Sequence, residues 1–228
     1  MKQTTYDTIA RVLPFGLYML FIAAAEIPTL WGGSPPSPQF MLRLYPVKIV
    51  LVTAALVAFR KSYTDMDWKS LGNIGHSLLS AGVGVAVFVA WIQLDTAFAV
   101  QGELTSYDPT IAQNSAERLF LIFGRVLGAA VCVPIMEELF WKSFLARYLI
   151  HKNFMKVRAG TYTVFTFLAT AVLFGLEHQL LAAGIFAGLA FNFIYWKTGS
   201  LAQCILSHGV TNLILALYVL VTGAWYFW

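Results

Sequence analysis

Charged residues are scarce in this sequence. Its 228 residues include 15 Lys and Arg and 11 Asp and Glu, so that 11% are charged, whereas 59% are hydrophobic. A soluble domain carries about 25% charged residues, and the mean hydropathy of +0.71 is far above that of a water-exposed fold. The scarcity excludes an ordinary soluble domain. It predicts an all-α, polytopic transmembrane helix bundle in the lipid bilayer, with seven or eight spans at about 20 residues each, in a single integral membrane domain covering residues 1–228.

Cysteine is equally rare, and basic residues form no stripe. Cys132 and Cys204 both lie in apolar runs, without the spacing of a metal site, a redox motif or a disulfide framework. The formal net charge of +4 is small, which excludes nucleic-acid binding and indicates a bias of the loops. The first apolar run, from Val12 to Leu30, is longer than the core of a signal peptide, so we expect a retained first helix.

Seven apolar runs are separated by shorter polar segments. They cover about residues 12–30, 45–59, 71–94, 119–150, 162–177, 180–196 and 201–228. The fourth run is too long for one upright helix, about 48 Å at 1.5 Å per residue, and Pro134 should break or kink it. The pattern predicts seven crossings, and an eighth would need a break at Pro134. The last two short runs before residue 197 should be antiparallel neighbours, because almost no loop joins them.

The charges that remain alternate along the chain. Basic residues precede the first run and cluster at 60–69, at 147–158 and at Lys197, whereas the 95–118 segment is acidic. By the positive-inside rule the basic segments are cytoplasmic and the acidic segment lies outside. This arrangement is consistent with seven crossings.

Two adjacent carboxylates and a lysine interrupt the fourth apolar run. An ionisable group near the bilayer centre costs at least about 2.5–3.5 kcal/mol, so it normally faces a protein interior or a water-filled cavity. Glu138 and Lys142 are four residues apart on one helical face, in the favourable order for an ion pair. Glu137 points about 100° away and stays unpaired. Pro134 lacks a backbone donor and should free the carbonyl of Ala130 beside the acids.

Two further motifs place polar residues in apolar runs at helical spacing. Phe174 precedes His178 by four residues, and His208 precedes Asn212 by four. Any one buried histidine could simply link helices by a hydrogen bond, and the Glu138–Lys142 pair alone could be structural. Taken together, a carboxylate, two histidines and an amide are what activation of a water molecule and stabilisation of an oxyanion require.

The three motifs in this order resemble those of the CAAX-processing and bacteriocin-processing (CPBP) family of intramembrane glutamic endopeptidases. The resemblance covers about residues 118–215, and Lys142 stands where the family has arginine. A lysine keeps the charge but loses the bidentate fork. The residues from Phe140 to Phe144 also resemble the branch associated with exosortase systems.

The resemblance implies a mechanism and a substrate. Glu137, assisted by His178, would activate a water molecule, and His208 with Asn212 would stabilise the oxyanion. Supporting positions would be Glu138, Lys142 and Phe174. The implied chemistry needs no metal or other cofactor, and the substrate would be a membrane-bound polypeptide, prenylated or simply hydrophobic. We expect an integral protein of a bacterial inner (cytoplasmic) membrane.

Three alternatives remain open. Glu137, His178 and His208 could instead form a zinc site of two histidines and one glutamate. A non-catalytic membrane scaffold or immunity protein of the same fold is a second alternative, because of the lysine at position 142. A proton-coupled transporter is the third, since embedded carboxylates and histidines also serve proton relays, although the sequence lacks paired broken helices in two halves.

Overall fold

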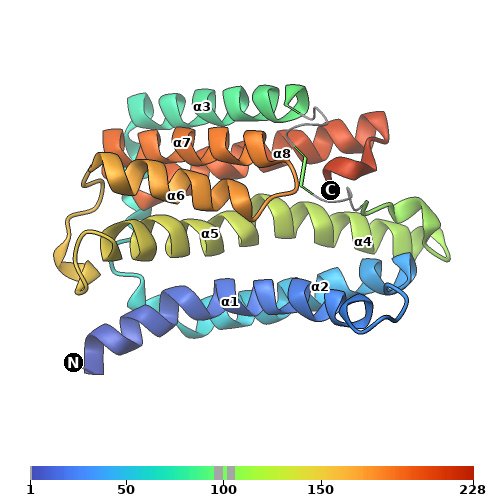
Figure 1. Ribbon diagram of the computed structural model, residues 1–228. Helices are drawn as coiled ribbons and strands as arrows, with labels where there is room; N and C mark the ends of the chain where they lie inside the picture. Colours follow the sequence, from blue (N-terminus) through green and yellow to red (C-terminus); the bar gives the residue numbers. More distant parts are fainter. Residues whose placement is uncertain (1, 95–99, 102–105) are drawn as a thin grey trace.

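The chain folds into a bundle of helices that run roughly parallel and antiparallel to one another (Figure 1). The structure is a computed structural model that describes residues 2–94, 100–101 and 106–228. Its α-helices are α1 (Lys2–Leu30), α2 (Pro38–Ala58), α3 (Ile74–Gln93), α4 (Ser115–Leu127), α5 (Val133–Glu138), α6 (Val164–Leu176), α7 (Leu181–Thr198) and α8 (Leu201–Thr222). Among the described residues, the β-structure is limited to an isolated bridge between Val100 and Leu180. The predicted all-α class is confirmed.

The helix that carries the two adjacent glutamates is continuous. It runs from Ser115 to Ala146 through α4 and α5, with π-helical segments at Gly128–Cys132 and Leu139–Ala146. Of the two outcomes expected at Pro134, two pieces or one kinked helix, the structure excludes the first, because the wider π turn accommodates the proline inside one helix. An eighth span by that route is excluded.

Five helices in the described chain are long and apolar enough to cross a membrane. They are α1, α2, α3, the Ser115–Ala146 helix and α8. The seven or eight spans expected from the sequence counted α6 and α7 as full crossings, but α6 has 13 residues and is about 20 Å long. The bundle is an integral membrane fold in which the α6–α7 hairpin does not reach as far as its neighbours.

The turn between α6 and α7 therefore lies inside the bundle. A short segment that follows α3 closes this turn: the backbone N–H of Gln101 donates to Gln179 O at 2.7 Å, and its side-chain amide donates to His178 O at 3.0 Å. Val100 forms the bridge to Leu180 beside them. The turn's backbone groups are thus satisfied away from water, as burial in a membrane protein requires.

Small residues allow α6 and α7 to pack closely as antiparallel neighbours, as the short connection predicted. A Cβ on Gly184 would lie 2.8 Å from Gly175 Cα, and one on Gly188 would lie 2.8 Å from Ala171 Cα. Such close backbone approach is typical of helix pairs in membranes. It holds the turn, and the side chains on it, against the centre of the bundle.

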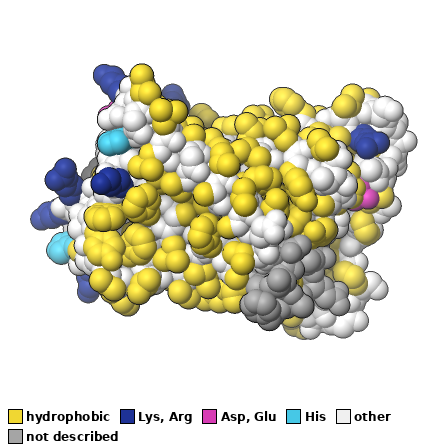
Figure 2. Space-filling model, turned by 90° about the horizontal axis from the view of Figure 1, so that it is seen from above, with side chains coloured by type: hydrophobic (Ala, Val, Ile, Leu, Met, Phe, Trp, Pro, Cys, Tyr) yellow, Lys and Arg dark blue, Asp and Glu magenta, His cyan; other side chains and the backbone are white. Residues whose placement is uncertain are grey.

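Positive charge gathers at one end of the molecule. Figure 2 shows Lys and Arg side chains at the end where the chain begins, and a mainly hydrophobic surface along the helices. This agrees with the predicted clustering of basic loops on one side. Of the acidic segment expected on the other side, Asp95 and Glu103 lie outside the described residues.

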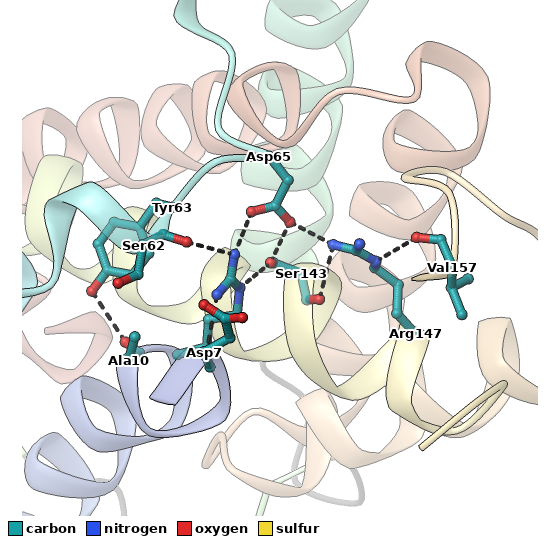
Figure 3. Close-up of polar contacts among 9 residues, drawn as sticks. Asp7, Ala10, Ser62, Tyr63, Asp65, Ser143, Arg147 and Val157 are labelled. Atoms are coloured by element: carbon teal, nitrogen blue, oxygen red, sulfur yellow. Dashed lines mark hydrogen bonds and ion pairs between the residues drawn. The ribbon is translucent and has the colours of Figure 1, made fainter. Parts of the chain in front are cut away.

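At the basic end, a network of ion pairs and hydrogen bonds joins segments that are distant in the sequence (Figure 3). Arg11 is fully buried, although its sequence position had indicated a flanking charge at the membrane surface. It donates from Nη2 to Asp65 Oδ1 and from Nε to Ser143 Oγ, both at 2.6 Å. The other oxygen of Asp65 accepts from Ser143 and Arg147. One carboxylate in the α2–α3 connection thereby joins α1 to the end of the Ser115–Ala146 helix.

We expect Asp65→Asn to destabilise the protein by about 3–5 kcal/mol at neutral pH, because it removes the carboxylate that two buried arginines share. Burial alone would raise the pKa of Asp65, but Arg11, the Ser143 hydroxyl and Arg147 together lower it below its usual value. The stabilisation is therefore present above the usual carboxyl pKa and is lost as pH falls through the lowered one. Thermal unfolding in detergent across pH measures both effects. Asp67→Asn, at an exposed position in the same connection, is the matched control. An equal Tm for both variants would show that the ion pairs of Asp65 do not stabilise the fold.

Candidate active site

A cavity of about 180 Å³ lies within the bundle. Glu137, from the Ser115–Ala146 helix, lines it together with His178 from the α6–α7 turn and with His208 and Asn212 from α8. Phe174 from α6 forms part of the same wall. The four residues expected to be catalytic thus reach one cavity from three separate parts of the chain.

Glu138 is held by two partners, one at each oxygen. It is fully buried, as is Lys142, whose Nζ lies 3.8 Å from Glu138 Oε2 in the ion pair that the spacing predicted. The Nδ1 atom of His208 lies 3.0 Å from Glu138 Oε1. The lysine is thus one of two groups that fix this carboxylate.

Glu137 has a different environment from its neighbour. Its side chain is buried, with 5% exposure for the residue, and its Oε2 has no hydrogen-bond partner among the described residues. The Nε2 atom of His208 faces this oxygen at 3.9 Å. The imidazole of His208 therefore lies between the two glutamates, stacked on Phe191 at 4.7 Å between ring centroids. The sequence had paired this histidine with Asn212 and, in the zinc alternative, with Glu137 and His178, but not with Glu138.

The hydrogen bond of His178 fixes the form of its ring. Its Nδ1 lies 2.7 Å from Phe174 O, and a carbonyl oxygen can only accept, so Nδ1 carries the proton. In the neutral ring, Nε2 then keeps a lone pair for a proton or a metal. The rings of Phe174 and Trp91 pack against the imidazole at 4.7 and 5.3 Å. In the Phe-x-x-x-His motif, Phe174 thus supplies both the carbonyl that accepts from His178 and a ring that packs against the imidazole.

Asn212 connects α8 to the π-helical turn beside the glutamates. Its Nδ2 donates to Ala129 O at 2.8 Å. In the π register the preceding N–H already bonds Gly128 O, so Pro134 leaves the carbonyl of Ala129 without a backbone donor. The expectation that the free carbonyl is that of Ala130 is thereby corrected. An amide nitrogen has two hydrogens, and the second remains for a substrate.

Glu177 is the site residue that sequence reasoning missed. One carboxylate oxygen of Glu177, one of Glu137 and a ring nitrogen of His178 all lie within 4.8 Å of one another. Neither oxygen of Glu177 has a hydrogen-bond partner in the described chain, although its side chain is 10% exposed. The sequence placed Glu177 only in the short connection between two apolar runs and gave it no role. The absence of Gly, Pro or Asn from positions 177–180 was the signal against an exposed turn.

These three residues also form a set that fits a metal ion. Two carboxylates and one imidazole leave an open position, as in catalytic sites of zinc and related metals. The zinc alternative had named His208 with Glu137 and His178. In the described residues the ligand atoms that gather belong to Glu137, Glu177 and His178, so that Glu177 takes the place that this alternative had given to His208.

Comparison with known proteins identifies the region that carries these motifs. Residues 119–214 match the family model described as Type II CAAX prenyl endopeptidase Rce1-like. No curated protein and no solved structure matches the chain. The family expected from the three motifs is confirmed for these residues, whereas the exosortase-associated branch stays a prediction.

Proposed function

We propose that this chain, a member of the Rce1-like CPBP family by its residues 119–214, is an intramembrane endopeptidase. Its substrate is a membrane-associated polypeptide, prenylated or simply hydrophobic, and its location is a bacterial inner membrane. The observation that carries the proposal is the cavity inside the bundle, lined by Glu137, His178, His208 and Asn212. A family of membrane proteases and a buried carboxylate beside two histidines support the same chemistry.

In this mechanism Glu137 is the general base. A water molecule between Glu137 Oε2 and His178 Nε2 transfers a proton to the carboxylate as its oxygen attacks the scissile carbonyl carbon. The carbonyl electron pair moves to oxygen, and the second N–H of Asn212 donates to that oxyanion. The proton on Glu137 then passes to the leaving amine as the C–N bond breaks. Glutamate is regenerated at the end of the cycle.

His208 connects the two glutamates during this cycle. Its Nδ1–H donates to Glu138, so its Nε2 can donate to an oxyanion only while the ring carries both protons. Glu138 holds the ring through Nδ1, and Lys142 pairs with the other oxygen of Glu138. Neither of these two residues lines the cavity itself. In this proposal His208 assists Asn212, and the frame of Glu138 and Lys142 sets its orientation.

The test is cleavage by the purified full chain in proteoliposomes. We would offer one hydrophobic peptide with and without a farnesyl group, and identify products by mass spectrometry against Glu137→Gln as the inactive variant. Cleavage of either peptide by the wild type supports the proposal, and the comparison assigns the lipid requirement. Proton-driven uptake by liposomes without any product would instead support a transporter. Stable protein with neither activity would support a scaffold.

A metal-dependent protease is the second candidate function, favoured by the cluster of Glu137, Glu177 and His178. These three residues would hold the ion, which would lower the pKa of a bound water molecule and polarise the scissile carbonyl. The two candidates share the cavity and differ in the role of Glu177.

We expect a chelator to leave the cleavage rate within about twofold, because general-base catalysis by Glu137 needs no metal. Metal analysis of the active protein by mass spectrometry accompanies the assay. Loss of activity restored by zinc, with one ion per chain in the wild type and none in Glu177→Gln, would establish the metal-dependent mechanism instead. Glu117→Gln, outside the cavity, is the matched control for the loss of a carboxylate.

A further inference from the structure

The proposed mechanism relies on one constant hydrogen-bond donor for the oxyanion. It is the second N–H of Asn212, whose first N–H donates to Ala129 O at 2.8 Å. His208 uses its Nδ1–H on Glu138, and in the neutral ring its Nε2 is an acceptor. Loss of one donor from an oxyanion hole typically costs about 10²- to 10³-fold in rate. A second donor that keeps its proton throughout the cycle would therefore complete the site.

Tyr18 places a hydroxyl group at the same cavity. It belongs to α1, outside the residues 119–214 that the family model matches, and it lines the cavity together with Glu137 and Asn212. Its hydroxyl has no hydrogen-bond partner in the described part of the chain. A phenol is protonated at neutral pH and can donate a hydrogen bond. This donor is therefore available to a ligand in the cavity.

The other tyrosine in the cavity wall differs in this respect. The hydroxyl oxygen of Tyr45 is buried, and a Cβ on Gly128 would lie only 2.7 Å from it. This phenol therefore points at the π-helical turn rather than at the centre of the cavity. Of the two hydroxyl groups, that of Tyr18 is the candidate for contact with a substrate.

Two contacts define how α1 lies against the helix of the two glutamates, to which it runs antiparallel (Figure 1). Arg11 Nε donates to Ser143 Oγ at 2.6 Å. One turn later along α1, the ring of Phe15 stacks on that of Phe140, with 3.9 Å between the centroids. A step of four residues forward along α1 thus corresponds to a step of three residues back along the other helix.

This register places Tyr18 level with Glu137. Tyr18 follows Phe15 by three residues, and Glu137 precedes Phe140 by three. Residues three apart lie on the same helical face, so the next pair across this interface is Tyr18 with Glu137. The hydroxyl on α1 and the general base on the neighbouring helix therefore approach a bound scissile bond at the same depth in the membrane.

Lys48 from α2 holds the Tyr18 ring and strengthens its donor. The Nζ atom lies 3.8 Å from the centroid of the ring, a distance at which an ammonium group is attracted by the negative face of the ring. The cation draws electron density out of the ring, and the O–H bond at the ring edge becomes more polar as a result. Lys48 is thus a positioning residue, because it acts through Tyr18.

We propose that Tyr18 is a further catalytic residue, a second donor to the oxyanion. As the carbonyl electron pair moves to oxygen, the hydroxyl of Tyr18 donates to that oxygen from α1, while Asn212 donates from α8. The phenol keeps its proton, so the proton transfers of Glu137 are unchanged. This inference rests on the proposed peptidase function and adds a residue that the three sequence motifs do not contain.

The kinetic test is Tyr18→Phe, which keeps the ring and its contact with Lys48 and removes only the hydroxyl. We expect kcat to fall by about 10²- to 10³-fold, as for other oxyanion donors. KM should stay within about twofold, because the donor acts when charge develops on the oxygen. Thermal unfolding should be unchanged. Tyr6→Phe, on an exposed part of the same helix, is the matched control and should keep the wild-type kcat.

A binding measurement separates this inference from the proposed function. The probe is a peptide in which a difluoromethylene ketone replaces the scissile amide, because its hydrate has the tetrahedral carbon and oxygens of the intermediate. We expect Tyr18→Phe to weaken binding of this ketone by about tenfold or more. Binding of the uncleaved peptide to Glu137→Gln should be the same with and without Tyr18→Phe.

Each outcome decides between donor and wall residue. A Tyr18→Phe protein that keeps more than about a tenth of the wild-type kcat would overturn the inference and leave the proposed function intact. Equal weakening of ketone and peptide would overturn it too, because the hydroxyl would then bind the ground state. If the wild type cleaves no peptide, the proposed function fails. Ketone binding that depends on the hydroxyl would still support the donor, and binding that is independent of it, or absent, would overturn it.

Discussion

Glu137→Gln should lower kcat for peptide cleavage by about 10²- to 10⁴-fold, the contribution of a well-placed general base. Glutamine has the same shape but cannot accept the proton of the attacking water. The wild-type carboxylate oxygen Oε2 has no hydrogen-bond partner in the described chain, so the neutral amide removes an uncompensated charge from the interior. We therefore expect the variant to unfold at the same temperature as the wild type or above it.

Two measurements check this result together: initial rates of cleavage in proteoliposomes and thermal unfolding in detergent. Glu26→Gln is the matched control, because Glu26 lies on an exposed part of α1 and should leave both quantities unchanged. A Glu137→Gln protein that keeps more than about a tenth of the wild-type kcat would exclude Glu137 as the base. A large fall in stability would show that the carboxylate also holds the bundle together.

The spacing of motifs predicted where most site residues lie. Residues four apart share a helical face, so the positions of Glu138 with Lys142 and of His208 with Asn212 followed from the sequence. Hydrophobic runs placed those faces in the membrane interior, where ionisable groups normally face a cavity. These rules are local, and they hold whether or not neighbouring helices are known.

Contacts between distant segments could not be predicted in this way. The bond from His208 to Glu138 joins residues 70 positions apart, and the Asn212 bond to Ala129 joins residues 83 apart. Both depend on how α8 packs on the π-helical turns. Arg11 illustrates the same limit: its charge indicated a membrane boundary, but Asp65, a partner 54 positions away, allows it to be buried.

The lengths of helices were the other source of error. An apolar run from Tyr162 to Glu177 has the composition of a span, yet α6 is Val164–Leu176 and stops inside the bundle. Whether such a run crosses a membrane depends on what satisfies the backbone at its end, and here Gln101 supplies those hydrogen bonds. The buried turn places Glu177 close to Glu137. No sequence motif links these two residues, so their contact could not be predicted.

Lys142→Met should destabilise the protein by about 3–5 kcal/mol, because it removes one partner of a fully buried ion pair. Glu138 would then keep His208 as its remaining partner and draw that ring toward Oε1, away from Glu137. We expect kcat to fall with stability, and thermal unfolding with cleavage rates measures both. Lys152→Met, at an exposed position in the following loop, is the control for loss of a lysine.

Lys142→Arg asks whether the family's arginine would improve the site. A bidentate fork needs both oxygens of a carboxylate, but in this chain His208 occupies Oε1 and leaves Oε2 for the lysine. A larger guanidinium at a fully buried position costs about 1–3 kcal/mol in packing. We therefore expect Lys142→Arg to lower the Tm without raising kcat. A variant that is both more stable and faster would show that the lysine weakens the frame, and would favour a scaffold role for the natural chain.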